Sequence, residues 1–328
     1  SPKAMVLRGL LRRLGVEADV VLGERRGGED GALPSPDRFD RVFVRLAGKD
    51  GKVLIDPSVP MQGGDYRSMY FPPGTRGLEL DGQSDGLKEL VADNRGLPRS
   101  VIRERFWVPG FEGETRLEME IEHRNHAADQ VRYLTGKRGG GALAEAVYRR
   151  LAAIYPEVRR EGEMVFEDDL DNNVVRARGV FMIPQLWRWD PRSRTWSASF
   201  FPRETAAMTG RSKGELCEFA FPSRVEQTTE VHGIGGVVRP PRADELRTAG
   251  FTLRCRGRIE GEVLLLQYEF EDRASSREEF SLVTDRESSL LSSRLHFSAR
   301  VSAPGASARR LRPQKEATPV VPPPARRY

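Results

Sequence analysis

The sequence predicts an α+β fold in which a helix and antiparallel strands come first. A mainly antiparallel, β-sandwich-like domain with one or two helices follows. Three observations predict this class. A helical period opens the chain at residues 2–15, short alternating segments recur from residue 18 to residue 270, and helical periods return only near residues 142–155 and 276–291. The 328 residues, 38% of them hydrophobic, allow two domains with separate cores.

The first predicted unit covers residues 1–95 and begins with an amphipathic helix. Ser1 can cap this helix, Pro2 suits its first position and Gly15 suits its end. Its apolar side chains recur at i, i+3, i+4 and i+7: Leu7, Leu10, Leu11 and Leu14. Strands are predicted at residues 18–23, 40–46 and 52–56. The turn pair Asp50–Gly51 joins the last two strands into a hairpin.

The second predicted unit covers residues 96–301 and consists mainly of strands. Residues 116–122 alternate apolar and charged side chains, which predicts a strand with one face in water. Further strands are predicted at residues 164–166, 174–183, 195–201, 224–231, 251–255 and 262–270. One helix, at residues 142–155, follows the break at residues 139–141. A capping-box spacing starts a last helix at residues 276–291.

The tail at residues 302–328 is rich in Pro, Ala and Arg. It is predicted to be disordered, because it has little apolar surface to bury. The charges of the tail sum to +5, which equals the net charge of the whole chain. They come from Arg309, Arg310, Arg312, Lys315, Arg326 and Arg327 against Glu316. The predicted folded body is therefore neutral, which argues against a nucleic-acid partner. No apolar run approaches the ~18 residues of a membrane span.

The two cysteines, Cys217 and Cys255, leave a disulfide open, since sequence alone does not decide their pairing. Cys255 lies on the apolar side of an alternating segment. A small buried core side chain is therefore favoured over a reactive thiol at this position.

Four segments of the first 80 residues occur in an order typical of one protein family. They are a helix with its turn at residues 3–18, a loop at 33–40, an Asp–Pro segment at 55–58 and a stretch at 74–80. This set resembles the transglutaminase-like superfamily. Residues 1–95 then correspond to the C-terminal part of a transglutaminase/papain-like core that begins upstream of Ser1. Looser cues extend the resemblance to about residue 295 and to a bacterial subgroup with a C-terminal β-rich domain of unknown function: residues 154–156, 168–173 and 180–184.

The resemblance implies acyl transfer or hydrolysis by a Cys-His-Asp triad, in which the Asp orients the His that moves the proton. The family's Cys position lies at or before Ser1, its His position is occupied by Arg41 and its Asp position by Asp56. No Cys precedes Cys217, and no His precedes His123. A guanidinium cannot act as a general base. The resemblance therefore implies a degenerate triad, with an Arg41–Asp56 ion pair in its place.

Two functional hypotheses follow. The first is a catalytically inactive binding or scaffold module of a bacterial envelope protein, periplasmic or extracytoplasmic by resemblance, with no cofactor and no metal. The alternative is a thiol acyl-transferase or cysteine-peptidase-like amide hydrolase, with its Cys upstream and with His123 or His126 as its base. In both cases a core without its N-terminal part leaves the leucines of the first helix short of packing partners.

Three further patterns have both a functional and a plain interpretation. The spacing of His123 and His126 suits metal ligands on a helix, but a solvated turn is favoured because the preceding residues alternate as a strand. The acidic run at 167–173 suggests Ca²⁺, but it lacks the Gly and the distal Glu of an EF-hand loop, so a polar turn is favoured. Residues 136–141 lack the order of a phosphate loop, which favours a flexible linker.

Aromatic and basic residues alternate in one short region: Trp187, Arg188, Trp189, Arg192, Arg194 and Trp196. Such a cluster can bind a polysaccharide or a peptide by stacking. Arginines packed on the indole rings around a turn at Asp190–Pro191 explain the pattern without any ligand, and this interpretation is favoured.

Overall fold

The computed structural model describes residues 1–24, 36–48, 51–71, 75–82, 84, 86–92, 96–138, 141–200, 224–247, 251–272 and 297–302. The predicted helix at 276–291, Cys217 and the predicted disordered stretch after residue 302 lie outside these residues. Ser302 ends a strand, so it is not the first residue of the tail.

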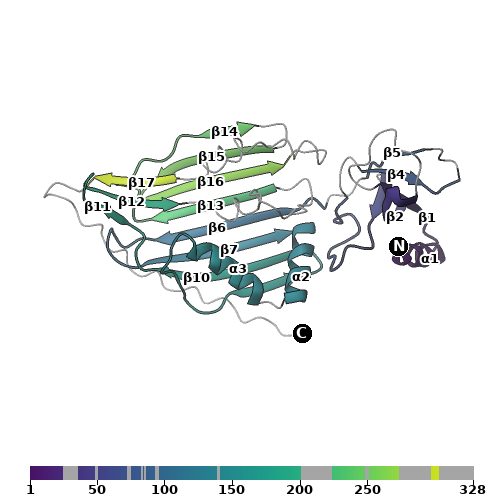
Figure 1. The fold of residues 1–328 in the computed structure, drawn as a ribbon, viewed down its shortest axis with the longest axis horizontal. Helices are drawn as coiled ribbons and strands as arrows, with labels where there is room; N and C mark the ends of the chain where they lie inside the picture. The colour runs from purple at the N-terminus through teal and green to yellow at the C-terminus, as the bar shows by residue number, and fades with distance from the viewer. Residues whose placement is uncertain are drawn as a thin grey trace.

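Five strands of the N-terminal region form one antiparallel sheet in the order β3-β2-β1-β4-β5. Figure 1 labels β1, β2, β4 and β5 of this sheet. Their bounds are β1 Ala18–Glu24, β2 Phe39–Gly48, β3 Gly51–Ile55, β4 Arg76–Glu79 and β5 Lys88–Glu89. A 3-10 turn, η1 Pro36–Arg38, leads into β2. The helix α1, Pro2–Arg13, packs on β1 and β2. The predicted order of helix, strand and hairpin is therefore present.

This small sheet buries apolar side chains on both faces. Ala4, Leu7 and Leu11 of α1 pack on the face that includes Val44. The opposite face has its own cluster: Val21, Phe43, Leu54, Phe71 and Leu90. Successive strand residues point to opposite faces, so Phe43 and Val44 belong to different clusters. A sheet that is covered on both faces explains why β1 and β2 are apolar runs without clean alternation.

Only part of the predicted apolar stripe of α1 is buried. Leu7 and Leu11 pack against the sheet, while Leu10 and Leu14 are 58% and 79% exposed. Leu7 and Leu11 therefore have packing partners among the described residues, whereas Leu10 and Leu14 face solvent.

A second, mixed sheet of nine strands is the largest sheet among the described residues. Its order is β14-β15-β16-β13-β6-β7-β10-β8, with β9 also paired to β10. The bounds are β6 Arg99–Trp107, β7 Thr115–Arg124, β8 Arg159–Arg160, β9 Val165–Asp169, β10 Val174–Ile183, β13 Arg224–His232, β14 Asp244–Arg247, β15 Phe251–Glu260 and β16 Val263–Asp272. Strands β6 and β13 run parallel, and the other neighbours are antiparallel.

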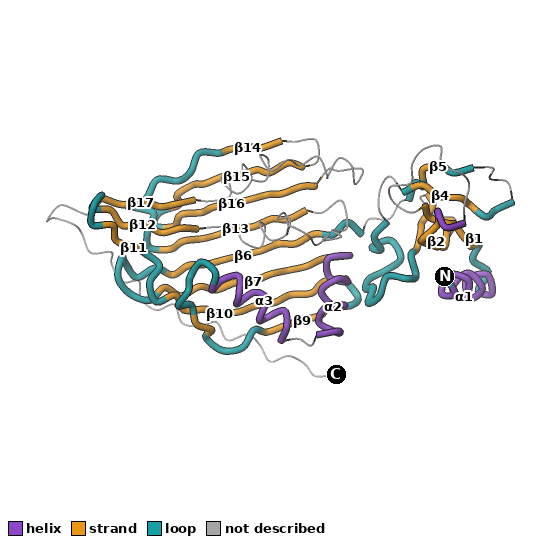
Figure 2. Tube along the Cα trace, in the orientation of Figure 1, coloured by secondary structure: helices purple, strands orange, loops and turns teal. Residues whose placement is uncertain are grey.

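One face of the large sheet, here called the inner face, carries a second layer of helices and short strands (Figure 2). The layer consists of α2 His126–Arg138, α3 Gly141–Ala152, β11 Arg188–Asp190, β12 Thr195–Phe200 and β17 Phe297–Ser302. The three short strands form a sheet in the order β11-β12-β17. This layering gives the molecule its sandwich-like, β-rich character.

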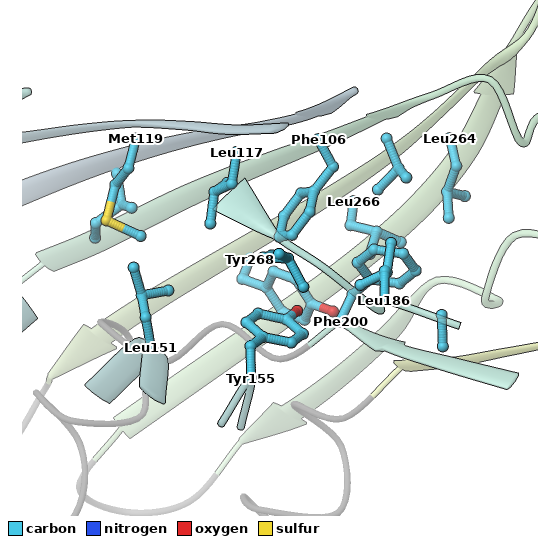
Figure 3. Packing of buried hydrophobic residues seen from close by; sticks show 14 of the residues in the cluster. Phe106, Leu117, Met119, Leu151, Tyr155, Leu186, Phe200, Leu264, Leu266 and Tyr268 are labelled. Carbon is cyan, nitrogen blue, oxygen red and sulfur yellow. The ribbon is translucent and has the colours of Figure 1, made fainter. Parts of the chain in front are cut away.

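The main core lies between these two layers (Figure 3). Phe106 of β6 meets Phe200 of β12 edge to face, with ring centroids 5.3 Å apart, and meets Tyr155 at 6.3 Å. Leu117 of β7 and Leu151 of α3 belong to the same cluster. Burial of each such side chain contributes ~1.5–3 kcal/mol, so this core holds the layers together.

The β-rich α+β class is confirmed, but the sequence analysis missed two elements that position polar residues. Helix α2 occupies residues assigned to a solvated turn and a linker. Its buried apolar residues are only Ala128 and Val131, too few for a clear helical period. Strand β6 was missed because its buried side includes Ser100 and Glu104 between apolar residues, which breaks the alternation.

Candidate functional site

The position that the resemblance assigns to the triad Asp holds a buried carboxylate directly after β3. Asp56 is 4% exposed, and its Oδ1 accepts hydrogen bonds from the backbone N–H of Ser58 at 2.9 Å and from the Ser58 hydroxyl at 2.5 Å. Its Oδ2 lies 3.6 Å from Nη1 of Arg41, whose side chain is 43% exposed. The contact expected between Arg41 and Asp56 is therefore present.

The local sequence explains how this carboxylate is held. Pro57 ends β3 because it has no N–H to continue the strand ladder. An Asp side chain readily accepts a hydrogen bond from the backbone two residues on, as Asp56 does from Ser58. Gln62 donates from Nε2 to the Asp56 carbonyl at 3.3 Å. The turn thus fixes one carboxylate oxygen and leaves the other facing Arg41.

Arg41 is placed by the register of β1 and β2. It lies opposite Gly23, where an added Cβ would be 2.4 Å from the ring of Phe43. A side chain at position 23 would therefore displace the β2 residues beside Arg41. A guanidinium donates hydrogen bonds and accepts none. The pair can hold charge in place, but it cannot take up a proton from a nucleophile.

His123 is buried inside the large sheet, so its interpretation as part of a solvated turn is wrong. It lies in β7, and its Nδ1 is 2.9 Å from the hydroxyl of Ser100 in β6. Burial, together with the nearby charge of Arg150, lowers the pKa of His123 to about 4. An imidazole enclosed in this core cannot serve as the base of a site in the small sheet.

His126 begins α2 and contacts the segment that joins β3 to β4 of the small sheet. Its ring stacks on Tyr70 with centroids 5.1 Å apart, and its Nδ1 lies 3.6 Å from Oδ2 of Asp129. The solvated-turn interpretation is therefore wrong for His126 as well. The ring is held between an aromatic neighbour and a buried carboxylate.

The sequence analysis missed a buried polar cluster beside His126, here called the linker node: Gly63, Asp129, Arg132 and Asn173. The N–H of Gly63 donates to Oδ1 of Asp129 at 3.1 Å. Nη1 of Arg132 donates to the same oxygen at 3.3 Å and to Oδ1 of Asn173 at 2.6 Å. Asp129 and Arg132 are three residues apart on one helix face. That spacing would have revealed the pair if residues 126–138 had been recognised as a helix.

The acidic run at 167–173 forms the hairpin between β9 and β10, in agreement with a polar turn. The side chain and backbone N–H groups of Asn172 donate to Asp169 and lower the pKa of that carboxyl. Nε of Arg132 donates to both carboxylate oxygens of Asp168 at 2.8 and 3.0 Å. In the part of the chain that the structure describes, no three His, Cys, Asp or Glu side chains gather as a metal site. Cys255 is buried in the main core, as predicted.

The tryptophans pack on other aromatic rings. Trp187 is fully buried, and Phe111 meets it edge to face at 5.1 Å. The other side of this group is formed by Trp196, which stacks on Phe111 at 5.6 Å and lies 5.3 Å from Trp189. Within the described ranges, the arginines that lie over aromatic rings lie over tyrosines. The predicted turn at Asp190–Pro191 is present between β11 and β12, and packing between aromatic rings accounts for the tryptophan cluster.

The outer face of the large sheet, opposite the main core, is a ladder of Arg–Glu pairs. Glu120 lies 3.2 Å from Arg103 and 3.4 Å from Arg178, and Arg105 lies 3.3 Å from Glu230. A hollow of about 310 Å³ is lined in part by Arg103, Arg105, Arg178 and Glu120. Its three arginines are all paired with glutamates, so the hollow offers a ligand no unpaired cation.

Comparisons with known proteins assign no family to the chain, since no family model and no curated protein matches it. A solved structure from Parabacteroides distasonis ATCC 8503, described as a "putative protease", aligns with 9% identity and a TM-score of 0.38. The alignment covers 91% of this chain and 43% of that protein, so this chain spans less than half of its length. Such a likeness carries no argument about activity. None of the described helices has the length and apolar content needed to cross a membrane.

Proposed function

We propose that this chain is a binding or scaffold module of a bacterial envelope protein, built on a transglutaminase-like frame whose triad is degenerate. The contact between Arg41 and Asp56 carries the proposal. In a working triad the Asp orients a His that accepts and returns a proton. Here a guanidinium, which accepts no proton, faces the buried carboxylate at 3.6 Å. Asp56 therefore pairs with a fixed charge, and the site lacks a base.

The described histidines support the loss of catalysis. His123 is hydrogen-bonded inside the large sheet, His126 is stacked at the start of α2, and His232 is stacked on Trp107 with centroids 4.0 Å apart. All three lie outside the small sheet that positions Asp56. The alternative, a thiol acyl-transferase or amide hydrolase with an upstream Cys, needs a base that these residues do not supply.

Turnover by the unmodified chain tests the absence of activity. With a glutamine-containing peptide, we expect no ammonia release and no amine incorporation above an Asp56→Asn control. Release that disappears in Asp56→Asn would overturn the proposal in favour of the amide hydrolase.

A further inference from the structure

The flank of α1 exposes a continuous apolar stripe. Val6, Leu10 and Leu14 recur at i, i+4 and i+8 and are 62%, 58% and 79% exposed, with Met5 beside them at 55%. Single exposed apolar residues are ordinary, but a contiguous group on one helix marks an interaction surface. These four residues are called the α1 stripe below.

Gly9 opens a notch beside the α1 stripe. It lies in the middle of the helix, where glycine is less stable than alanine. A Cβ at Gly9 would meet nothing within 4 Å, so the packing of this chain does not require glycine there. The missing side chain allows the backbone of a partner to approach closely between Val6 and Leu10. A stripe and a notch at the same place are two separate indications of an occupant.

The charge around the stripe selects the kind of occupant. Helix α1 contains Lys3, Arg8, Arg12 and Arg13 and no acidic residue. Arg12 is paired with Asp19 at 3.0 Å, while Lys3 and Arg13 are exposed. A second copy docked through the same surface would bring two all-cationic helices together, and like charges repel. The complementary partner is acidic.

We propose that the α1 stripe docks an amphipathic helix that has an apolar seam and acidic flanks. A ridge of residues at i, i+4 and i+8 packs into the groove of another helix, and the notch at Gly9 shortens the distance between the two axes. A single ridge at i, i+4 and i+8 matches the groove of a second helix, and the vesicle test below separates this occupant from anionic lipid. The inference deepens the binding role proposed above. It rests on that proposal for one point only, namely that the chain acts by binding a partner.

Two synthetic amphipathic peptides test the inference by titration against the whole chain. They share one leucine seam, and their flanking positions are Glu in one and Lys in the other. We expect the Glu peptide to bind at least about tenfold more tightly, because its flanks complement the cations of α1. Leu10→Gln should weaken this binding about tenfold or more. Leu134→Gln, at a leucine of α2 that is 50% exposed, is the matched control and should leave it unchanged.

Gly9→Ala separates a docking role from a structural one. It should raise the thermal stability of the free chain and yet weaken binding of the Glu peptide, because the new methyl group fills the notch. Equal affinities for the two peptides, no measurable binding of the Glu peptide, or tighter binding by Gly9→Ala would each overturn the proposal. So would Leu10-dependent binding to phosphatidylglycerol vesicles without peptide binding. Turnover of the glutamine-containing peptide does not involve the stripe, so these failures are distinct from a failure of the proposed function.

Discussion

Helices α1 and α3 are each 12 residues long and have similar apolar periods, but their surroundings differ. In α3, Val147 and Leu151 are buried against the nine-stranded sheet. In α1, only one side meets the small sheet, and Leu10 and Leu14 remain exposed. An apolar period therefore predicts that a helix forms, but it does not tell which apolar positions have a partner within the same chain.

The two regions also treat buried carboxylates differently. In α2, which packs on the large sheet, Asp129 forms an ion pair with Arg132, and both residues are buried. In the small unit, buried Asp56 faces Arg41, which is open to water. A half-exposed partner is screened and weak, whereas loss of a buried partner leaves an uncompensated charge. Matched substitutions in the two regions can therefore break or sharpen the comparison.

The largest effect is expected at the linker node. Arg132→Met should destabilise the protein by about 3–5 kcal/mol, because Asp129 would remain buried without its cation. Urea unfolding measures the loss, and hydrogen exchange at residues 61–70 should rise because Gly63 is held by the same carboxylate. Arg178→Met, on the exposed ladder, is the control and should cost under ~1 kcal/mol. A similar cost for both variants would mean that the node is no stronger than a surface pair.

A leucine in each helix tests the comparison directly. Leu151→Ala should destabilise by about 2–5 kcal/mol, since it leaves a cavity in the main core. Leu14→Ala should change stability by less than ~0.5 kcal/mol, as expected for an exposed position. Thermal or urea unfolding provides the measurement. A cost at Leu14 comparable to that at Leu151 would show that α1 already has a partner in the chain.

His123 makes the free energy of unfolding depend on pH, with stability falling in acid. Its folded pKa is lowered to about 4 from 6.5, so the unfolded chain binds the proton first as pH falls. The stabilisation is complete above about pH 6.5 and is lost between pH 6.5 and 4, by about 3 kcal/mol in total.

The variant His123→Asn should lose this part of the acid sensitivity. Carboxylates such as Asp19, whose pKa is lowered mainly by its hydrogen bond from Arg45, destabilise both proteins in acid. The difference between the two urea titrations therefore isolates His123. Parallel titrations of wild type and variant across this range would show that the imidazole is not enclosed in the folded state.

His123 also shows where sequence reasoning reached its limit. Elements with a regular period were predictable, and β10 has the predicted bounds of residues 174–183. The inner face of β6, which lies beside His123, has no such period. Its Ser100 and Glu104 are buried and form hydrogen bonds with His123 and Thr229. Helix α2 is stabilised by long-range polar partners, and tertiary context of this kind overrides local propensity.

The two polar sites differ for the same reason. The contact between Arg41 and Asp56 was predictable, because the resemblance named both positions and a hairpin brings them together. The linker node joins Gly63 to Asp129, residues separated by 66 positions. No local window contains both, so neither period nor spacing could indicate that contact.

The smallest effect is expected at Arg41. Arg41→Met leaves Oδ2 of Asp56 without its cation, but water reaches the half-exposed position and replaces part of the interaction. The cost should be at most ~1 kcal/mol by urea unfolding, far below that of Arg132→Met. Asp56→Asn should cost more, since Oδ1 accepts two hydrogen bonds from Ser58 and is held inside the turn. If Arg41→Met instead costs as much as Arg132→Met, Arg41 is a structural counter-ion of the small sheet, and its presence says nothing about a lost catalytic base.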